Sequence, residues 1–153
     1  LSSSSAASDV YKRQKLPHYY FIQLGNALNN AHIFGNLITS HLTTVLHPEI
    51  VAETADFFLK HERIGTVLCT GLYKETLILS IRTGSEQINA GDLIKKLPLD
   101  PDNVGGHDKS AGGFVHVDKK NKQEVTAIVT RLQTAFAELL GYKSAVWRKL
   151  LDP

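Results

Sequence analysis

Two pairs of glycines near the middle of the chain enclose a short polar segment that could bind an anion. Gly105-Gly106 and Gly112-Gly113 flank the residues His107-Asp108-Lys109-Ser110. A glycine pair permits positive φ angles and lets a ligand approach main-chain N–H groups that a Cβ atom would shield. A histidine and a lysine between such pairs could direct charge or hydrogen-bond donors toward one anion. The pattern predicts a phosphate-binding loop, and a glycine-rich turn between a helix and a strand is the alternative.

Two familiar phosphate-binding motifs are absent from this segment. The P-loop requires a glycine directly before Lys-Ser, and Asp108 stands there instead. The dinucleotide fingerprint Gly-x-Gly-x-x-Gly is also absent, because the glycines occur as adjacent pairs. Any phosphate site here must therefore be of another kind.

An arginine precedes this segment at the end of an expected strand. Residues 66–73 and 76–83 are strand-like and are separated by the polar pair Lys74-Glu75, which predicts an antiparallel hairpin. Ser80 and Arg82 share one face of the second strand, with Arg82 near its exit. An arginine beside a glycine loop could hold a phosphate through two hydrogen bonds, and a solvated arginine at the sheet edge is the alternative.

Length and composition narrow the classes of function. The chain has 153 residues, 42% hydrophobic and 21% charged, which is typical of one globular domain, and its net charge of +2 is unlike that of a binder of long nucleic acid. No apolar run approaches the roughly 20 residues of a membrane span. Cys69, the only cysteine, lies in an apolar run, so we expect a buried thiol and a cytoplasmic location. No spacing typical of metal ligands or of a nucleophile is present, so we expect neither a catalytic residue nor a metal ligand.

The spacing of apolar residues predicts an α/β fold. Helical periodicity and N-terminal capping residues predict helices flanking a mixed sheet of four or five strands. The glycine segment would lie at one edge of that sheet. The expected helices begin near residues 15, 48, 90 and 121, and the expected strands cover residues 36–42, 66–73, 76–83 and 113–117.

The chain divides into three expected segments. Residues 1–14 are small and polar and look like translated adapter sequence joined to a truncated reading frame, so we expect a disordered leader. Residues 15–34 would form a linker helix, and residues 35–153 would form one domain.

Three segments together resemble the DHHA1 domain of DHH-family phosphoesterases. They are Ser80-Ile81-Arg82-Thr83, residues 88–93, and the stretch from Gly105-Gly106-His107 to Gly113. Residues 24–28 and 48–56 are similar to the linker and first helix of the branch that contains oligoribonucleases and phosphoadenosine phosphate phosphatases. The resemblance covers about residues 19–140. Val104 departs from the pattern, because many relatives have a further glycine before the histidine.

The resemblance implies that this chain is the substrate-binding lobe of a hydrolase acting on short oligoribonucleotides or nucleoside phosphates. A missing N-terminal DHH lobe would hold two Mn²⁺ or Mg²⁺ ions, and this chain, which has no Asp-His-His motif, would bind no cofactor and be inactive alone. Arg82 and His107 would be ligands of the substrate phosphate, Gly105 and Gly106 would offer their backbone, and Ser80 would complete the substrate-binding set. The expected partners are a short oligonucleotide or nucleoside phosphate and the missing lobe. A stand-alone nucleic-acid-binding module is the alternative.

Overall fold

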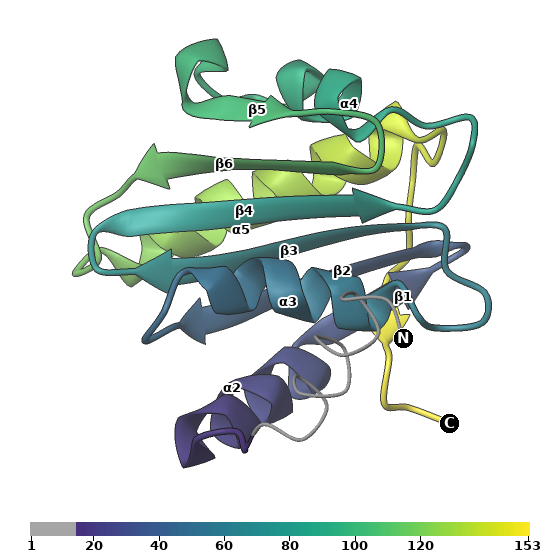
Figure 1. Ribbon diagram of the computed structural model, residues 1–153. Helices are drawn as coiled ribbons and strands as arrows, with labels where there is room; N and C mark the ends of the chain where they lie inside the picture. The colour runs from purple at the N-terminus through teal and green to yellow at the C-terminus, as the bar shows by residue number, and fades with distance from the viewer. Residues whose placement is uncertain (1–14) are drawn as a thin grey trace, which may run out of the picture.

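The computed structural model describes residues 15–153 as one mixed β-sheet with helices on both faces (Figure 1). The expected leader, residues 1–14, lies outside the described residues. The sheet has the strand order β5-β6-β4-β3-β2-β1-β7. Its strands are β1 (Ala31–Phe34), β2 (Leu37–Thr44), β3 (Thr66–Tyr73), β4 (Thr76–Thr83), β5 (Val104–Gly106), β6 (Ser110–His116) and β7 (Arg148–Lys149). The helices are α2 (His18–Asn29), α3 (Glu49–Phe58), α4 (Ala90–Lys96) and α5 (Lys122–Leu139), and a 3₁₀ turn, η1 (Pro101–Asn103), precedes β5.

The predicted α/β class with a mixed sheet is confirmed, but the number of strands is not. The described residues form seven strands, where we expected four or five. Strands β2 and β3 are parallel and are connected through α3, and the other neighbouring strands are antiparallel. Helices α2 and α3 cover one face of the sheet, and α4 and α5 cover the other (Figure 1). None of the described helices is both long and apolar enough to cross a membrane.

The three strands that we did not expect, β1, β5 and β7, are short. The prediction that residues 31–34 continue the linker helix is wrong, because α2 ends at Asn29 and these residues pair with β2. Ala31 and Ile33 are buried and alternate with less buried neighbours, as in a strand. A segment of four residues is too short for the sequence to distinguish the helical period from the strand period. Gly35, at a φ of 58°, forms the turn that returns the chain into β2. Strands β5 and β7 have only three and two residues.

The predicted hairpin and helix caps are confirmed. Strands β3 and β4 pair along their whole length around a two-residue turn, in which Lys74 has a φ of 54°. Asn89 accepts a hydrogen bond from Asp92 N at 2.9 Å at the start of α4. Asn121 accepts one from Glu124 N at 3.0 Å at the start of α5. Such side-chain acceptors satisfy N–H groups that a helix leaves free in its first turn.

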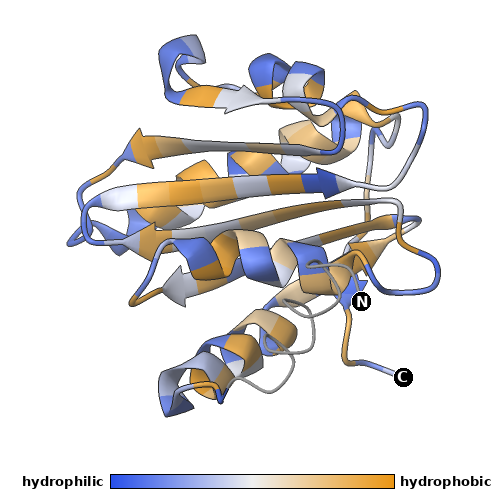
Figure 2. Ribbon diagram, in the orientation of Figure 1, coloured by the Kyte–Doolittle hydropathy of each residue, from blue (hydrophilic) through white to orange (hydrophobic). Residues whose placement is uncertain are grey.

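Each face of the sheet has its own hydrophobic core, and the central strands are accordingly the most apolar part of the fold (Figure 2). Leu68, Leu79 and Ile81 point toward α4 and α5, whereas Val67 and Cys69 point toward α2 and α3. No described residue of β5 or β6 belongs to the core beneath α2 and α3. That end of the sheet is therefore open on the α3 side.

Candidate functional site

Strand register places most of the predicted binding residues on this open face. Ser80 lies opposite Gly112, and Arg82 lies opposite Ser110, in the pairing of β4 with β6. Gly105 lies opposite Gly112 in the pairing of β5 with β6. Residues directly opposite each other in an antiparallel pair point to the same side of the sheet. Ser80 and Arg82 are therefore on the same face as Gly105.

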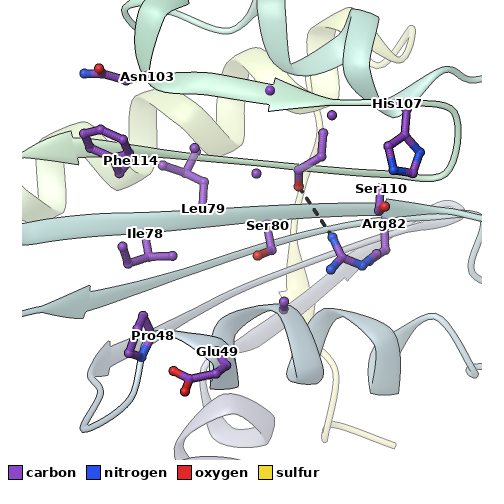
Figure 3. A pocket seen from close by; sticks show the side chains of 16 residues that line it. Pro48, Glu49, Ile78, Leu79, Ser80, Arg82, Asn103, His107, Ser110 and Phe114 are labelled. Carbon is purple, nitrogen blue, oxygen red and sulfur yellow. Dashed lines mark hydrogen bonds between the residues drawn. The ribbon is translucent and has the colours of Figure 1, made fainter.

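A tight turn brings His107 to the same face. The His107 N–H donates to Ser110 O at 3.0 Å and closes the turn between β5 and β6. His107 directly follows β5, and it lines the same groove as Gly105 (Figure 3). The first turn of α4 fixes this turn from the other side, since Gly91 N–H donates to His107 O at 3.1 Å and Ala90 N–H donates to the next carbonyl at 2.9 Å. The position of the imidazole thus depends on α4 as well as on the hairpin.

These residues line a groove of about 870 Å³ between α3 and the β5–β6 hairpin (Figure 3). Its size is suitable for a ligand as large as a nucleotide. Pro48, Glu49 and Ala52 of α3 form one wall. The structure brings all five residues predicted from the sequence into the lining of this groove: Ser80, Arg82, Gly105, Gly106 and His107.

Close packing requires the glycines at positions 106 and 113 of the segment, and none of its glycines is required for an unusual backbone angle. None of Gly105, Gly106, Gly112 and Gly113 has a positive φ, and all four lie in paired strands, so the glycines do not form the loop or turn that we expected of them; the turn of this segment comprises residues 107–109. A Cβ atom on Gly106 would lie 2.5 Å from Ala111 Cα. A Cβ atom on Gly105 would meet no atom within 4 Å. The groove is therefore floored by bare backbone at Gly105, which a ligand can approach closely.

Three hydrogen bonds hold the guanidinium of Arg82. Nε donates to Asp56 Oδ1 of α3 at 2.8 Å. Nη1 donates to Ile81 O at 2.9 Å and to Ala111 O at 3.5 Å, the second of which is drawn in Figure 3. Nη2 has no hydrogen-bond partner among residues 15–153. Arg82 therefore offers the groove an ordered, charged donor.

Ser80 and His107 supply further polar groups, whereas Cys69 does not. The Ser80 hydroxyl and the His107 imidazole have no hydrogen-bond partner in the described part of the chain. Ser80 is buried on the groove floor, and His107 is exposed. Cys69 lies opposite Ser80 on β3 and is completely buried, and burial raises the pKa of its thiol. The expectation of a buried thiol is confirmed, and Cys69 is no nucleophile at neutral pH.

The wall formed by α3 is acidic. Glu49, Glu53 and Asp56 follow one another at helical spacing, so they lie along one side of α3. Partial burial, together with repulsion from Glu49 and Asp56, raises the pKa of Glu53. The groove thus combines one ordered cation with negative charge on the facing helix.

The described residues do not fit a metal site. Within residues 15–153, no group of three or more His, Cys, Asp or Glu side chains is placed to hold a metal ion. The Mn²⁺ or Mg²⁺ ions implied by the resemblance would need ligands from elsewhere, and their presence stays a prediction.

Sequence reasoning missed several groove residues that other elements contribute. Glu49 and Ala52 of the lining come from α3, as does Asp56, which contacts Arg82, whereas Ser110 and Gly112 had been placed in the glycine segment but not in a strand. The two glycine pairs are separated by five residues, and this short spacing could have indicated a hairpin and hence the pairing of β5 with β6. The ion pair between Asp56 and Arg82 joins residues far apart in sequence, and no local pattern indicated it.

Comparison with known proteins identifies the fold. No family model and no curated protein matches the sequence. An exopolyphosphatase-related protein from Bacteroides fragilis is similar over 88% of this chain and 40% of its own, with a TM-score of 0.59 and 15% identity. RecJ from Thermus thermophilus, solved in complex with Mn²⁺, is similar over 78% of this chain and 16% of its own, with a TM-score of 0.50 and 18% identity.

The chain has a DHHA1-like fold. The resemblance found in the sequence is thereby confirmed at the level of the fold, and the branch of the family stays a prediction. The DHHA1-like chain spans less than half the length of these two proteins. What the whole proteins do therefore enters only as a proposal for this chain.

Proposed function

We propose that this chain binds the phosphate of a nucleotide or short oligonucleotide, as the substrate-binding lobe of a DHH-family phosphoesterase. The observation that supports the proposal most directly is the position of Arg82 and His107, which come from separate strands and line one groove. The DHHA1-like fold adds support, because the similar structures include an exopolyphosphatase-related protein and RecJ.

Each part of the groove has a chemical role in this proposal. Arg82 would bind a phosphate oxygen through Nη2, its unpaired donor. His107 and Ser80 would add hydrogen bonds from either side, and the bare backbone at Gly105 would admit the nucleoside. The metal ions, when bound by the additional lobe, would activate water for phosphoester cleavage. The contribution of this chain is to hold the substrate in position.

Calorimetric titration of the full chain with a 5′-phosphorylated dinucleotide tests the proposal. We expect Arg82→Ala to weaken binding about ten- to one-hundred-fold, which is the usual value of a hydrogen bond to a charged group, and His107→Ala about two- to ten-fold. Arg131→Ala is the matched control, because Arg131 is exposed on α5 at the opposite face of the sheet. Equal affinity in all four proteins would contradict the proposal.

The alternative, a stand-alone nucleic-acid-binding module, makes a different prediction. Its affinity would rise with RNA length and fall steeply with salt, because each neutralised phosphate releases counterions. A net charge of +2 favours a short ligand. Comparing the dinucleotide with an RNA of roughly 20 nucleotides at two salt concentrations separates the two functions. The cytoplasmic location stays a prediction.

A further inference from the structure

Asp56 shares one edge of the Arg82 guanidinium with one of the two N–H groups of Nη2, which are the guanidinium donors that remain for a ligand among the described residues. The planar guanidinium presents Nε–H and Nη2–H side by side along one edge. Asp56 Oδ1 accepts from Nε at 2.8 Å, and main-chain carbonyls occupy Nη1. An anion that binds the N–H of Nη2 on this edge therefore lies beside the Asp56 carboxylate, and one that binds the other N–H of Nη2 is still only one guanidinium away from it.

We propose that Asp56 determines which charge state of phosphate the groove accepts, and that it disfavours a dianionic phosphomonoester relative to a monoanionic phosphodiester. This inference rests on the proposed function of the groove. A phosphomonoester is largely dianionic above its second pKa of about 6, whereas a diester carries one charge. Two like unit charges about 4 Å apart repel each other by about 1 kcal/mol even in water, so each additional negative charge on a ligand beside the carboxylate lowers its affinity about five-fold.

The surroundings of Arg82 do not compensate for this repulsion. Asp56 does not line the groove itself, but its carboxylate lies 2.8 Å from Nε of the groove residue Arg82, and its side chain is 60% exposed. Glu49 lines the same wall, and Glu53 lies between Glu49 and Asp56 on α3, where burial and then repulsion from these two carboxylates raise its pKa. Lys109, the other cation of the hairpin turn, is engaged elsewhere, since its Nζ donates to Ser85 O at 3.0 Å.

Two ligands that differ by one charge, with one conservative variant, test the proposal. The ligands are adenosine 5′-monophosphate and its methyl ester, which have the same base and sugar. The variant Asp56→Asn keeps an oxygen acceptor for Arg82 Nε and removes the charge. Asp152→Asn is the matched control, because it makes the same change in net charge at an exposed position near β7, at the opposite edge of the sheet.

Calorimetry at low ionic strength and about pH 7.5, where the monoester is dianionic, gives the affinity ratio of the two ligands. We expect the wild type and Asp152→Asn to bind the monophosphate no more tightly than the ester. In Asp56→Asn the ratio should shift toward the monophosphate by about five-fold, with ester affinity within about two-fold of wild type.

The possible failures are distinguishable. If the wild type binds neither ligand, the proposed function itself fails. If both ligands bind and Asp56→Asn leaves their ratio at the wild-type value, only the role of Asp56 is overturned. Loss of ester binding in Asp56→Asn would also overturn it, because the carboxylate charge would then be needed for binding a monoanion.

Discussion

Gly105→Ala and Gly106→Ala add the same methyl group to adjacent positions of β5, but on opposite faces of the sheet. At Gly106 the new Cβ atom would lie 2.5 Å from Ala111 Cα and 2.6 Å from Ser110 O, which is closer than real Cβ atoms come to backbone atoms. The two strands would have to separate. Overpacking of this kind lowers the free energy of unfolding by about 1–3 kcal/mol.

At Gly105 the same methyl group would enter open space on the groove side, at a φ that alanine adopts freely. Replacing glycine by alanine at a compatible position raises the free energy of unfolding by about 0.4–1 kcal/mol, because the unfolded chain loses conformational freedom. The two variants should therefore differ by about 1.4–4 kcal/mol, with Gly106→Ala the less stable. Gly105→Ala should instead weaken ligand binding, because it fills space that the nucleoside would occupy.

Urea unfolding followed by the fluorescence of Trp147, the only tryptophan, measures the stability of both variants. The dinucleotide titration measures binding at a temperature where both remain folded. The reasoning is refuted if Gly105→Ala loses as much stability as Gly106→Ala. It is also refuted if Gly105→Ala binds the dinucleotide as tightly as the wild type, since the groove would then not use its glycine floor.

Two further predictions concern buried titratable groups. The Cys69 thiol should react with an alkylating reagent only as fast as the protein unfolds, because it is fully buried with a raised pKa, and labelling of the native protein at the rate of a free thiol would contradict this. Burial lowers the pKa of His41 below its ordinary value of 6.5, and a hydrogen bond to Thr70 only partly offsets this. As the pH falls below 6.5, His41 therefore takes up a proton in the unfolded state before it does so in the folded state. The free energy of unfolding should therefore decrease below that pH, by at most about 1.4 kcal/mol per pH unit, and urea titrations should show a flatter profile for His41→Gln; equal slopes would refute the assignment.

Local patterns were sufficient to predict most of the elements that carry the groove, and β5 is the exception. The β3–β4 hairpin followed from alternation around a polar pair, and the starts of α4 and α5 followed from Asn89 and Asn121 as capping residues. Arg82 and His107 were assigned to one pocket through the resemblance to the DHHA1 domain, and both line the groove. The hairpin and the helix starts depend on residues close in sequence, where intrinsic preferences decide the structure.

The features that the sequence did not reveal depend on contacts between distant segments. Strand β7 forms only because the end of the chain returns to pair with β1, and two residues carry no periodicity. The ion-pair partner of Arg82 was missed because Asp56 belongs to α3, which precedes β4 in the chain by more than a whole strand and packs on the face of the sheet that carries Arg82. Our reason for the glycines was also wrong at Gly106, where the cross-strand neighbour Ala111, and not a positive φ, excludes a side chain.

Because the β5–β6 hairpin lies at the end of the sheet, a ligand bound in the groove should make this hairpin more ordered. This hairpin is attached to the sheet through β4 alone and is supported from one side by the first turn of α4. Segments at the edge of a sheet open more readily than its central strands, without unfolding of the whole protein. A molecule lodged between the hairpin and α3 would contact both and so favour the closed arrangement by mass action. The β5–β6 hairpin, which carries His107, would therefore be most rigid when a ligand is bound in the groove.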